Sequence, residues 1–140
     1  MPMKLKNHDN SRKLLQEHFL PDQWKVLVVC IFLNCTQRAQ VEKMIWDFFE
    51  KFPTPEALLE ADDVDIANTI RSLGFYNRRT KLLKRFCQEY VSGKWSHASE
   101  LHGIGEYGAR AWEMLCLGIT GNTRPNDHAL AYLYDLRTSQ

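Results

Sequence analysis

The sequence predicts an all-α fold, and three observations support this class. Apolar residues recur at helical spacing along almost the whole chain, no segment shows a sustained alternation of apolar and polar residues, and proline or glycine stands at the ends of several helical stretches. With 140 residues, 44% of them hydrophobic and 25% charged, the chain has room for one globular domain or for two small lobes that share a core.

The N-terminal part is predicted to form three helices. Ser11 can cap a first helix over residues 11–19, with Gln16 on or beside its inner face. A second helix, over 23–34, is apolar all round in its middle, so we expect it to be central; a buried strand is the alternative. A third helix, over 36–51, turns one apolar side to the core: Val41, Met44, Ile45, Phe48 and Phe49.

Start and stop signals define the helices of the middle part. Thr54-Pro55-Glu56 starts one helix with proline at the first helical position, and a short helix over 62–73 follows until Gly74 ends it. Asn77 then caps a long amphipathic helix over 77–91. Its inward residues are predicted to be Leu82, Leu83 and Phe86, and its outward residues to be Arg78, Arg79, Lys81, Lys84 and Arg85.

The last third of the chain is predicted to contain two helices joined by a loop. A short turn over 97–101 and the segment Gly103-Ile104-Gly105 precede a helix over 107–117. A polar loop containing glycine and proline, over 118–126, leads into a last helix that contains 127–136.

Cysteine usage and the apolar runs give no sign of export or of a membrane partner. The four cysteines are too widely spaced for a CxxC metal site, and most sit in apolar helical patterns, which suggests reduced thiols in an intracellular protein: Cys30, Cys35, Cys87 and Cys116. The longest apolar run, 24–33, is far shorter than the roughly 20 residues of a membrane span. Residues 1–10 are polar, lack a signal-peptide core and are expected to be a flexible segment.

The segment Leu101-His102-Gly103-Ile104-Gly105 carries the first chemical signal. Two glycines around one apolar residue let a helix end, turn sharply and restart, while Ile104 plugs the turn into the core. The N–H groups that open the second helix then form an anion site suited to a phosphate. Tight helix connections also use glycine routinely, so this segment alone does not decide the function.

In this context the chain resembles a superfamily of DNA base-excision glycosylases named for a helix-hairpin-helix, a Gly/Pro-rich loop and an aspartate. Residues 101–105 stand at its hairpin, 118–126 at its loop and Asp127 at its aspartate. Residues 14–136 are similar to the thymine DNA glycosylase domains of methyl-CpG-binding proteins through Trp24-Lys25, Ile31-Phe32-Leu33-Asn34, Leu73-Gly74-Phe75-Tyr76, Glu100-Leu101-His102, Tyr107-Gly108 and Asp127-His128. The resemblance implies a two-lobed helical domain over 11–140, with the hairpin at about 98–118 and the aspartate helix at about 126–136.

The resemblance also implies a reaction. It indicates a monofunctional base excision repair enzyme that hydrolyses the N-glycosidic bond of thymine or uracil opposite guanine in double-stranded DNA and leaves an abasic site. Asp127 would be the catalytic carboxylate, which stabilises positive charge on the sugar and orients water; an ordinary helix cap is the alternative. Tyr107 stands where relatives that also cut the backbone carry the lysine of a Schiff base; a packing role is its alternative.

Further residues are assigned to DNA by the same resemblance. Gln16 would read the flipped pyrimidine, with a solvated helix position as the alternative. Phe75 would be an apolar wedge in the duplex, with a core plug as the alternative. Asn34 and Cys35 would occupy the other intercalating loop, and the hairpin would contact DNA through Gly103, Ile104 and Gly105.

Departures from the family pattern leave some contacts open. Cys35 and Ala129 stand where the methyl-CpG-type enzymes have arginine and lysine, and Gln37 or Arg38 could substitute. No cysteine follows Cys116, so the sequence predicts no iron–sulfur cluster, and a monovalent cation at the hairpin is compatible with the pattern. The family implies a nuclear monomer. The alternatives are a glycosylase specific for adenine or oxidised bases, and a noncatalytic DNA-binding module.

The formal net charge of +1 conceals two oppositely charged segments. Residues 42–65 carry a local net charge of −6, and residues 71–85 carry six basic residues and no acidic one. The basic segment includes Arg78 and Arg79 beside Phe75, so it is predicted to grip the DNA backbone; a solvated helix face is the alternative.

Overall fold

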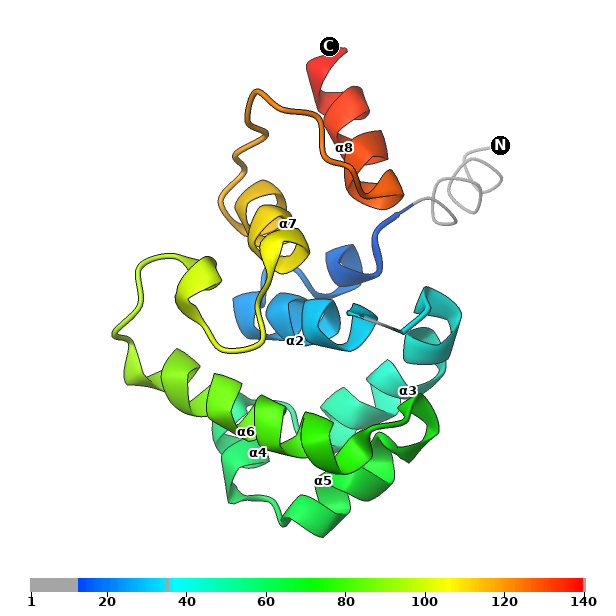
Figure 1. The fold of residues 1–140 in the computed structure, drawn as a ribbon, viewed down its shortest axis with the longest axis vertical. Coiled ribbons are helices and arrows are strands. Elements are labelled where there is room, and N and C mark those ends of the chain that lie inside the picture. The colour runs from blue at the N-terminus through cyan, green and yellow to red at the C-terminus, as the bar shows by residue number, and fades with distance from the viewer. Residues whose placement is uncertain (1–12, 35, 140) are drawn as a thin grey trace.

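The computed structural model describes residues 13–34 and 36–139, and every regular element in these ranges is helical (Figure 1). The all-α prediction is therefore confirmed. Three short 3₁₀ helices, labelled η, accompany the α-helices. In chain order the elements are η1 (Leu15–Phe19), α2 (Gln23–Leu33), α3 (Arg38–Lys51), α4 (Pro55–Glu60), α5 (Asp63–Thr69), η2 (Arg71–Leu73), α6 (Tyr76–Ser92), η3 (Ala98–Glu100), α7 (Glu106–Cys116) and α8 (His128–Thr138).

Several helix boundaries differ from those predicted. Ser11 lies outside the described residues, and from residue 13 to Phe19 the only helical element is the short η1. The helix expected over 62–73 ends at Thr69, because Ile70 leaves helical geometry at φ −101° and ψ 10°. Asn77 does not cap α6; Phe75 precedes the helix with a left-handed backbone, φ +49°, so the helix begins at Tyr76.

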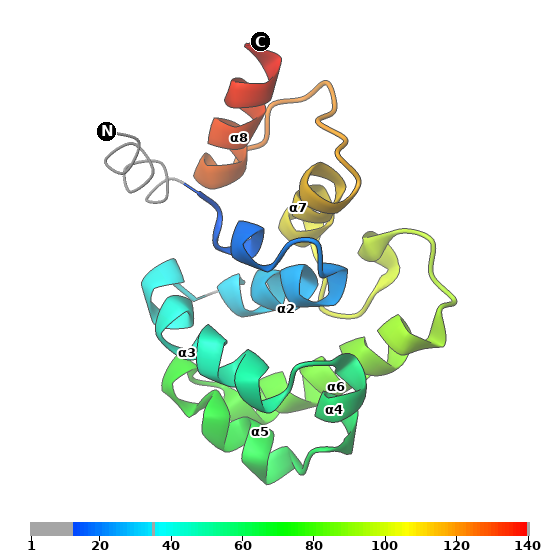
Figure 2. The same cartoon turned by 180° about the vertical axis from the view of Figure 1, so that it is seen from behind.

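Helix α2 lies at the centre of two lobes (Figures 1 and 2). Helices α3 to α6 cover one side of it, and η1, α7 and α8 lie on the other side. All residues from 26 to 32 are buried, as expected for a helix that is apolar all round, so the alternative of a buried strand is wrong. The predicted inner face of α3 is also buried, and it packs against α2 through the Phe32–Phe48 edge contact.

A second, smaller core joins α2 to the lobe formed by η1, α7 and α8. It consists of Leu14, Cys30, Ala111, Met114 and Leu130. The thiols of Cys30 and Cys87 are buried and free, and that of Cys116 is half-buried and free, while Cys35 lies outside the described residues. No helix in the described ranges is long and apolar enough to cross a membrane.

Candidate active site

The predicted hairpin is present between η3 and α7. Gly103 adopts φ +88°, which favours glycine, and a Cβ there would lie 2.7 Å from Leu82 Cδ2 of α6. Ile104 is buried in the main core, as the sequence predicts, and Gly105 is the extended residue before α7. The turn therefore lies against α6, and α7 packs on α2, where a Cβ on Gly108 would lie 3.4 Å from Cys30 Cβ. The first turn of α7 carries the acidic residue Glu106.

Asp127 stands at the junction of the Gly/Pro-rich loop and α8. Its backbone is extended, and its Oδ2 accepts a hydrogen bond of 3.0 Å from the N–H of Leu130, so it is the N-cap of α8. The side chain also remains exposed and lines two cavities. The capping role is thus observed, and it leaves the second carboxylate oxygen for other partners.

Gln16, Cys30 and Tyr107 meet although they are far apart in the sequence. The Gln16 Nε2 group donates to the Tyr107 hydroxyl at 2.6 Å and to Cys30 Sγ at 3.3 Å. Gln16 is fully buried, so the alternative of a solvated helix residue is wrong. Its Oε1 atom is buried and has no hydrogen-bond partner within the described part of the chain.

Burial also sets the protonation of this cluster. It raises the pKa of the Tyr107 phenol above its ordinary range, with a smaller contribution from the nearby Cys30. It raises the pKa of the Cys30 thiol to about 12. Both groups therefore keep their protons at neutral pH, and the Gln16 amide lies between neutral neighbours.

Two cavities share Tyr107 and Asp127. One has a volume of about 390 Å³ and lies where η1, the end of α2 and the start of α8 meet; its polar lining is Gln16, Asn34, Thr36, Arg38, Tyr107 and Asp127. The other has a volume of about 700 Å³ and lies between the hairpin and the loop 118–126. The fold thus brings four of the predicted site residues to one place, and it adds Arg38, which the sequence suggested only as a substitute.

Arg38 supplies positive charge at the smaller cavity. Its guanidinium donates to the carbonyl of Lys13, lies 3.6 Å from a carboxylate oxygen of Glu42, and is close enough to Tyr107 to lower the pKa of the phenol slightly against the effect of burial. Gln37 instead precedes α3 as its N-cap residue. Cys35 lies outside the described residues, so its place at the site is not described.

Phe75 lies apart from the cavities, in the turn between η2 and α6. Its side chain is 68% exposed, so the alternative of a core plug is wrong. The guanidinium of Arg78 lies over the ring, 5.5 Å from its centroid. A large aromatic side chain thus projects from a left-handed backbone position that usually carries glycine.

The prediction that Arg79 faces outward is wrong. Its side chain is only 8% exposed and points into the molecule, where it donates to Thr36 Oγ1 and to the carbonyl of Asn34. Arg79 lies on the same face of α6 as Leu83 and Phe86, four and seven residues on, and this spacing is the signal that would have identified it. It therefore joins the Phe75 end of α6 to the segment that rims the smaller cavity.

The rest of the basic segment is divided between surface and interior. Lys84 is half-buried and pairs with Asp63 at 2.9 Å, so it too departs from the predicted outward set. The exposed members are Arg71, Arg78, Lys81 and Arg85.

Among the residues that the structure describes, no group of three or more His, Cys, Asp or Glu could hold a metal ion.

Comparison with known proteins identifies proteins that are similar in sequence to this chain. The chain is 39% identical over 122 residues to the Methyl-CpG-binding domain protein 4-like protein of Arabidopsis thaliana, covering 87% of this chain and 27% of that protein. It is 28% identical over 94 residues to a thymine-DNA glycosylase of Aeropyrum pernix and 32% identical over 95 residues to a thymine/uracil-DNA glycosylase of Pyrobaculum aerophilum. These two matches cover 61% and 63% of this chain, and 42% and 41% of the relatives.

Solved structures share the fold. A thermostable thymine-DNA glycosylase superposes with a TM-score of 0.70 and 25% identity, over 79% of this chain and 54% of that one. An endonuclease III–DNA covalent intermediate superposes with a TM-score of 0.63 and 19% identity, over 71% of this chain and 50% of that one.

The model of the HhH-GPD superfamily of base excision DNA repair proteins matches residues 28–134, which include the hairpin, the loop and Asp127. The chain belongs to this superfamily.

Proposed function

We propose that the chain is a monofunctional DNA glycosylase that hydrolyses the N-glycosidic bond of thymine or uracil mispaired with guanine, leaving an abasic site. The observation that carries the proposal is the convergence of Asp127, Tyr107 and Gln16 on one cavity of about 390 Å³. Two relatives are described as glycosylases acting on thymine, or on thymine and uracil, which supports this choice of bases.

Asp127 has the chemistry that the reaction needs. Breaking an N-glycosidic bond develops positive charge on the sugar, which a neighbouring carboxylate stabilises while it orients the attacking water. Because the cap of α8 uses Oδ2, the carboxylate is held in place by its own helix while Oδ1 is left for water or sugar. Asp127 would thus combine the two roles that the sequence left as alternatives.

Gln16, Tyr107 and Asn34 are proposed to receive the flipped base. The Gln16 amide can offer both a donor and an acceptor, and its Nε2 is already engaged by Tyr107 and Cys30, so Oε1 is the atom left to accept a hydrogen bond from a base. Thymine and uracil carry a ring N–H that can make such a bond, once entry of the base uncovers Oε1.

Tyr107 is also the basis for proposing hydrolysis without backbone cleavage. A Schiff base needs a primary amine, and among residues 13–34 and 36–139 no lysine lines either cavity that contains Asp127. The protonated phenol of Tyr107 cannot take this role. Borohydride treatment during turnover should therefore trap no covalent adduct between the protein and DNA, and efficient trapping would contradict a hydrolytic mechanism.

Phe75 and the exposed basic residues are proposed to engage the duplex. The ring of Phe75 can enter the stack beside the unpaired guanine, while Arg78 and its exposed neighbours contact phosphates on either side. The hairpin N–H groups before and within α7 supply a further phosphate contact. By resemblance alone, the proposal extends to a monomer that acts in the nucleus.

The test is an excision assay on matched duplexes. Labelled DNA containing a guanine–thymine or guanine–uracil mismatch is incubated with the protein, and alkali reveals abasic sites; the fully paired duplex and duplexes with adenine or oxidised lesions are the controls. We expect strand breaks after alkali only in the mismatched duplexes. Asp127→Asn should bind mismatched DNA and excise almost no base. Near-normal turnover by this variant would remove Asp127 from the catalytic role.

A further inference from the structure

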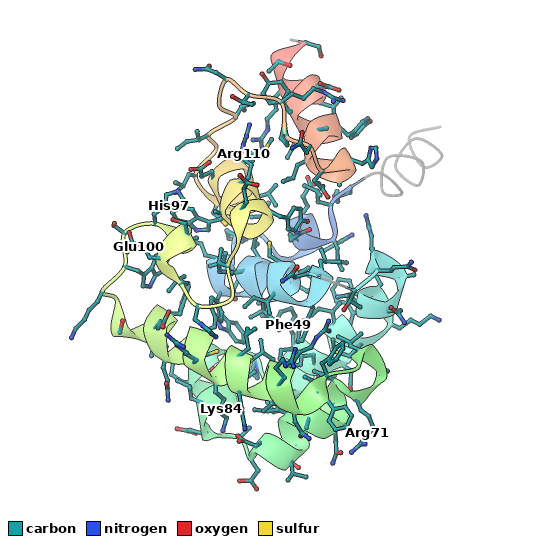
Figure 3. All side chains as sticks on the ribbon, in the orientation of Figure 1. Phe49, Arg71, Lys84, His97, Glu100 and Arg110 are labelled. Carbon is teal, nitrogen blue, oxygen red and sulfur yellow. The ribbon has the colours of Figure 1, made fainter. Side chains whose placement is uncertain are left out.

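The loop between α7 and α8 is hydrogen-bonded to a guanidinium group of α7. Arg110 projects from α7 toward this loop (Figure 3). Its Nη2 donates a hydrogen bond of 2.9 Å to the carbonyl of Thr120 and a second hydrogen bond to the carbonyl of Thr123. One side chain thus holds two points of the segment that ends at Asp127.

The loop backbone also lies directly against this guanidinium. Gly121 has φ +82°, and a Cβ at this position would come within 3.2 Å of Arg110 Nη2 and 3.7 Å of Arg110 Cζ. Any other residue there would be strained and would press on the guanidinium. Glycine at position 121 therefore lets the loop backbone lie against the Arg110 guanidinium, which in turn binds the carbonyl groups of Thr120 and Thr123.

The place of Arg110 on α7 connects this loop to the candidate active site. Arg110 follows Tyr107 by three residues, so the two side chains lie on the same side of the helix, and both line the cavity of about 700 Å³ together with Asp127. The helix that carries Tyr107 therefore holds, through Arg110, the loop that carries Asp127.

Apolar packing of Leu130 with Ala111 and Met114 holds the first turn of α8 to α7. Among the described residues, the other polar contacts of this region do not hold the middle of the loop to α7. Arg124 makes a bidentate pair with Asp135 at 3.0 Å for both bonds, and the Tyr134 hydroxyl donates to Asn122 O, so both tie the loop to α8 only. Arg137 does connect α8 to α7, through Met114 O at 2.7 Å, but at the end of α8 far from Asp127. The backbone bond from Ile119 N to Glu113 O fixes only the beginning of the loop.

We propose that Arg110 is a positioning residue, which sets the place of the Asp127 carboxylate relative to Tyr107 by fixing the loop between them. The inference rests on the proposed function, in which Asp127 acts on the sugar. A displacement of a reacting group by about 1 Å lowers a rate by about 100-fold, even when the change is remote from the chemistry. Loss of Arg110 should therefore slow excision without weakening the binding of DNA.

The experiment measures two quantities for each variant on the same guanine–uracil duplex: the single-turnover rate of excision, and the dissociation constant, determined in the Asp127→Asn background. Arg110→Ala should slow excision by about 100-fold and leave the dissociation constant within about twofold. Arg110→Lys, which retains a donor for one carbonyl, should recover part of the rate. Gly121→Ala, which disturbs the contact from the loop side, should also slow excision, and adding it to Arg110→Ala should cost little more.

Arg124→Ala is the matched control, because it removes an arginine of the same loop whose partner lies on α8. It should excise at close to the wild-type rate. A wild-type rate in Arg110→Ala, an equal loss in Arg124→Ala, or a loss that arises entirely from weaker binding would overturn the inference. Thermal melting shows that each variant is folded, and Arg110→Lys and Gly121→Ala decide the question if Arg110→Ala is not. Failure of the wild-type chain to excise any mismatched base would instead refute the proposed function.

Discussion

Replacement of Phe75 should lower the affinity for mismatched DNA while changing the free energy of unfolding only slightly. The ring is 68% exposed and follows a left-handed backbone, so it contributes little to the core and holds a strained position. Phe75→Gly removes both the ring and the strain, whereas Phe75→Ala removes the ring and keeps the strain. The two variants therefore form a matched pair.

The expected magnitudes follow from these contacts. Loss of the buried third of the ring costs about 0.5–1 kcal/mol, and loss of the exposed contact with Arg78 costs about 0.5–1 kcal/mol. A left-handed backbone costs about 1–2 kcal/mol for a residue with a Cβ, which glycine recovers, less about 0.5–1 kcal/mol for its freedom in the unfolded chain. Phe75→Gly should thus be close to the wild type in stability, and Phe75→Ala about 1 kcal/mol less stable than Phe75→Gly.

The binding of mismatched DNA should respond differently. Stacking of an aromatic side chain on a base contributes about 1–3 kcal/mol, so both variants should lose about 5- to 150-fold in affinity. Urea denaturation measures the free energy of unfolding, and fluorescence anisotropy in the Asp127→Asn background measures the dissociation constant for the guanine–thymine duplex. An affinity within twofold of the parent for both variants would refute the wedge, and a glycine variant less stable than the alanine variant would refute the strain.

Arg78→Ala should lower the slope of DNA affinity against salt concentration by about one phosphate contact. Arg79→Ala should leave this slope unchanged and lower the free energy of unfolding in urea by about 1–3 kcal/mol, because its hydrogen bonds are internal. Equal slopes for the two variants would contradict this division. Tyr107→Phe removes the acceptor of the Gln16 amide and should cost about 1–3 kcal/mol of stability, and an unchanged urea midpoint would exclude the hydrogen bond. Burial raises the pKa of the Cys30 and Cys87 thiols from 9.0 to about 12, so the unfolded chain releases these protons first, and stability should fall as pH rises from about 9 toward 12. Urea midpoints at pH 8 and pH 10 test this, and Cys87→Ala should reduce the fall.

The fold could be predicted from the sequence because its signals are local. Helical spacing, proline at the start of α4 and glycine after η2 mark elements without knowledge of the rest of the chain. The central place of α2 followed from its uniform hydrophobicity. The start of α6 could not be predicted in this way, since the left-handed backbone of Phe75 depends on the packing around it, and Asn77 is a plausible cap on local grounds.

The candidate site could be predicted only in part. Asp127, Tyr107 and Gln16 were identified through resemblance, and the structure adds their meeting at one cavity. The burial of Arg79 departs from the prediction because charged side chains are rarely buried, although its spacing from Leu83 matches the inner face. The proposed role of Arg110 depends on carbonyl groups of a loop with no regular pattern, so no signal in the sequence indicates it.

The internal bonds of Arg79 bear on how a duplex would be opened. This side chain connects the start of α6, next to Phe75, to the segment containing Asn34. These are two of the regions proposed to enter DNA. Because their spacing is set when the chain folds, little conformational entropy remains to be lost at the moment of binding. On the proposed function, the distortion would then fall on the nucleic acid, and the mismatches that unstack most easily would be bound preferentially.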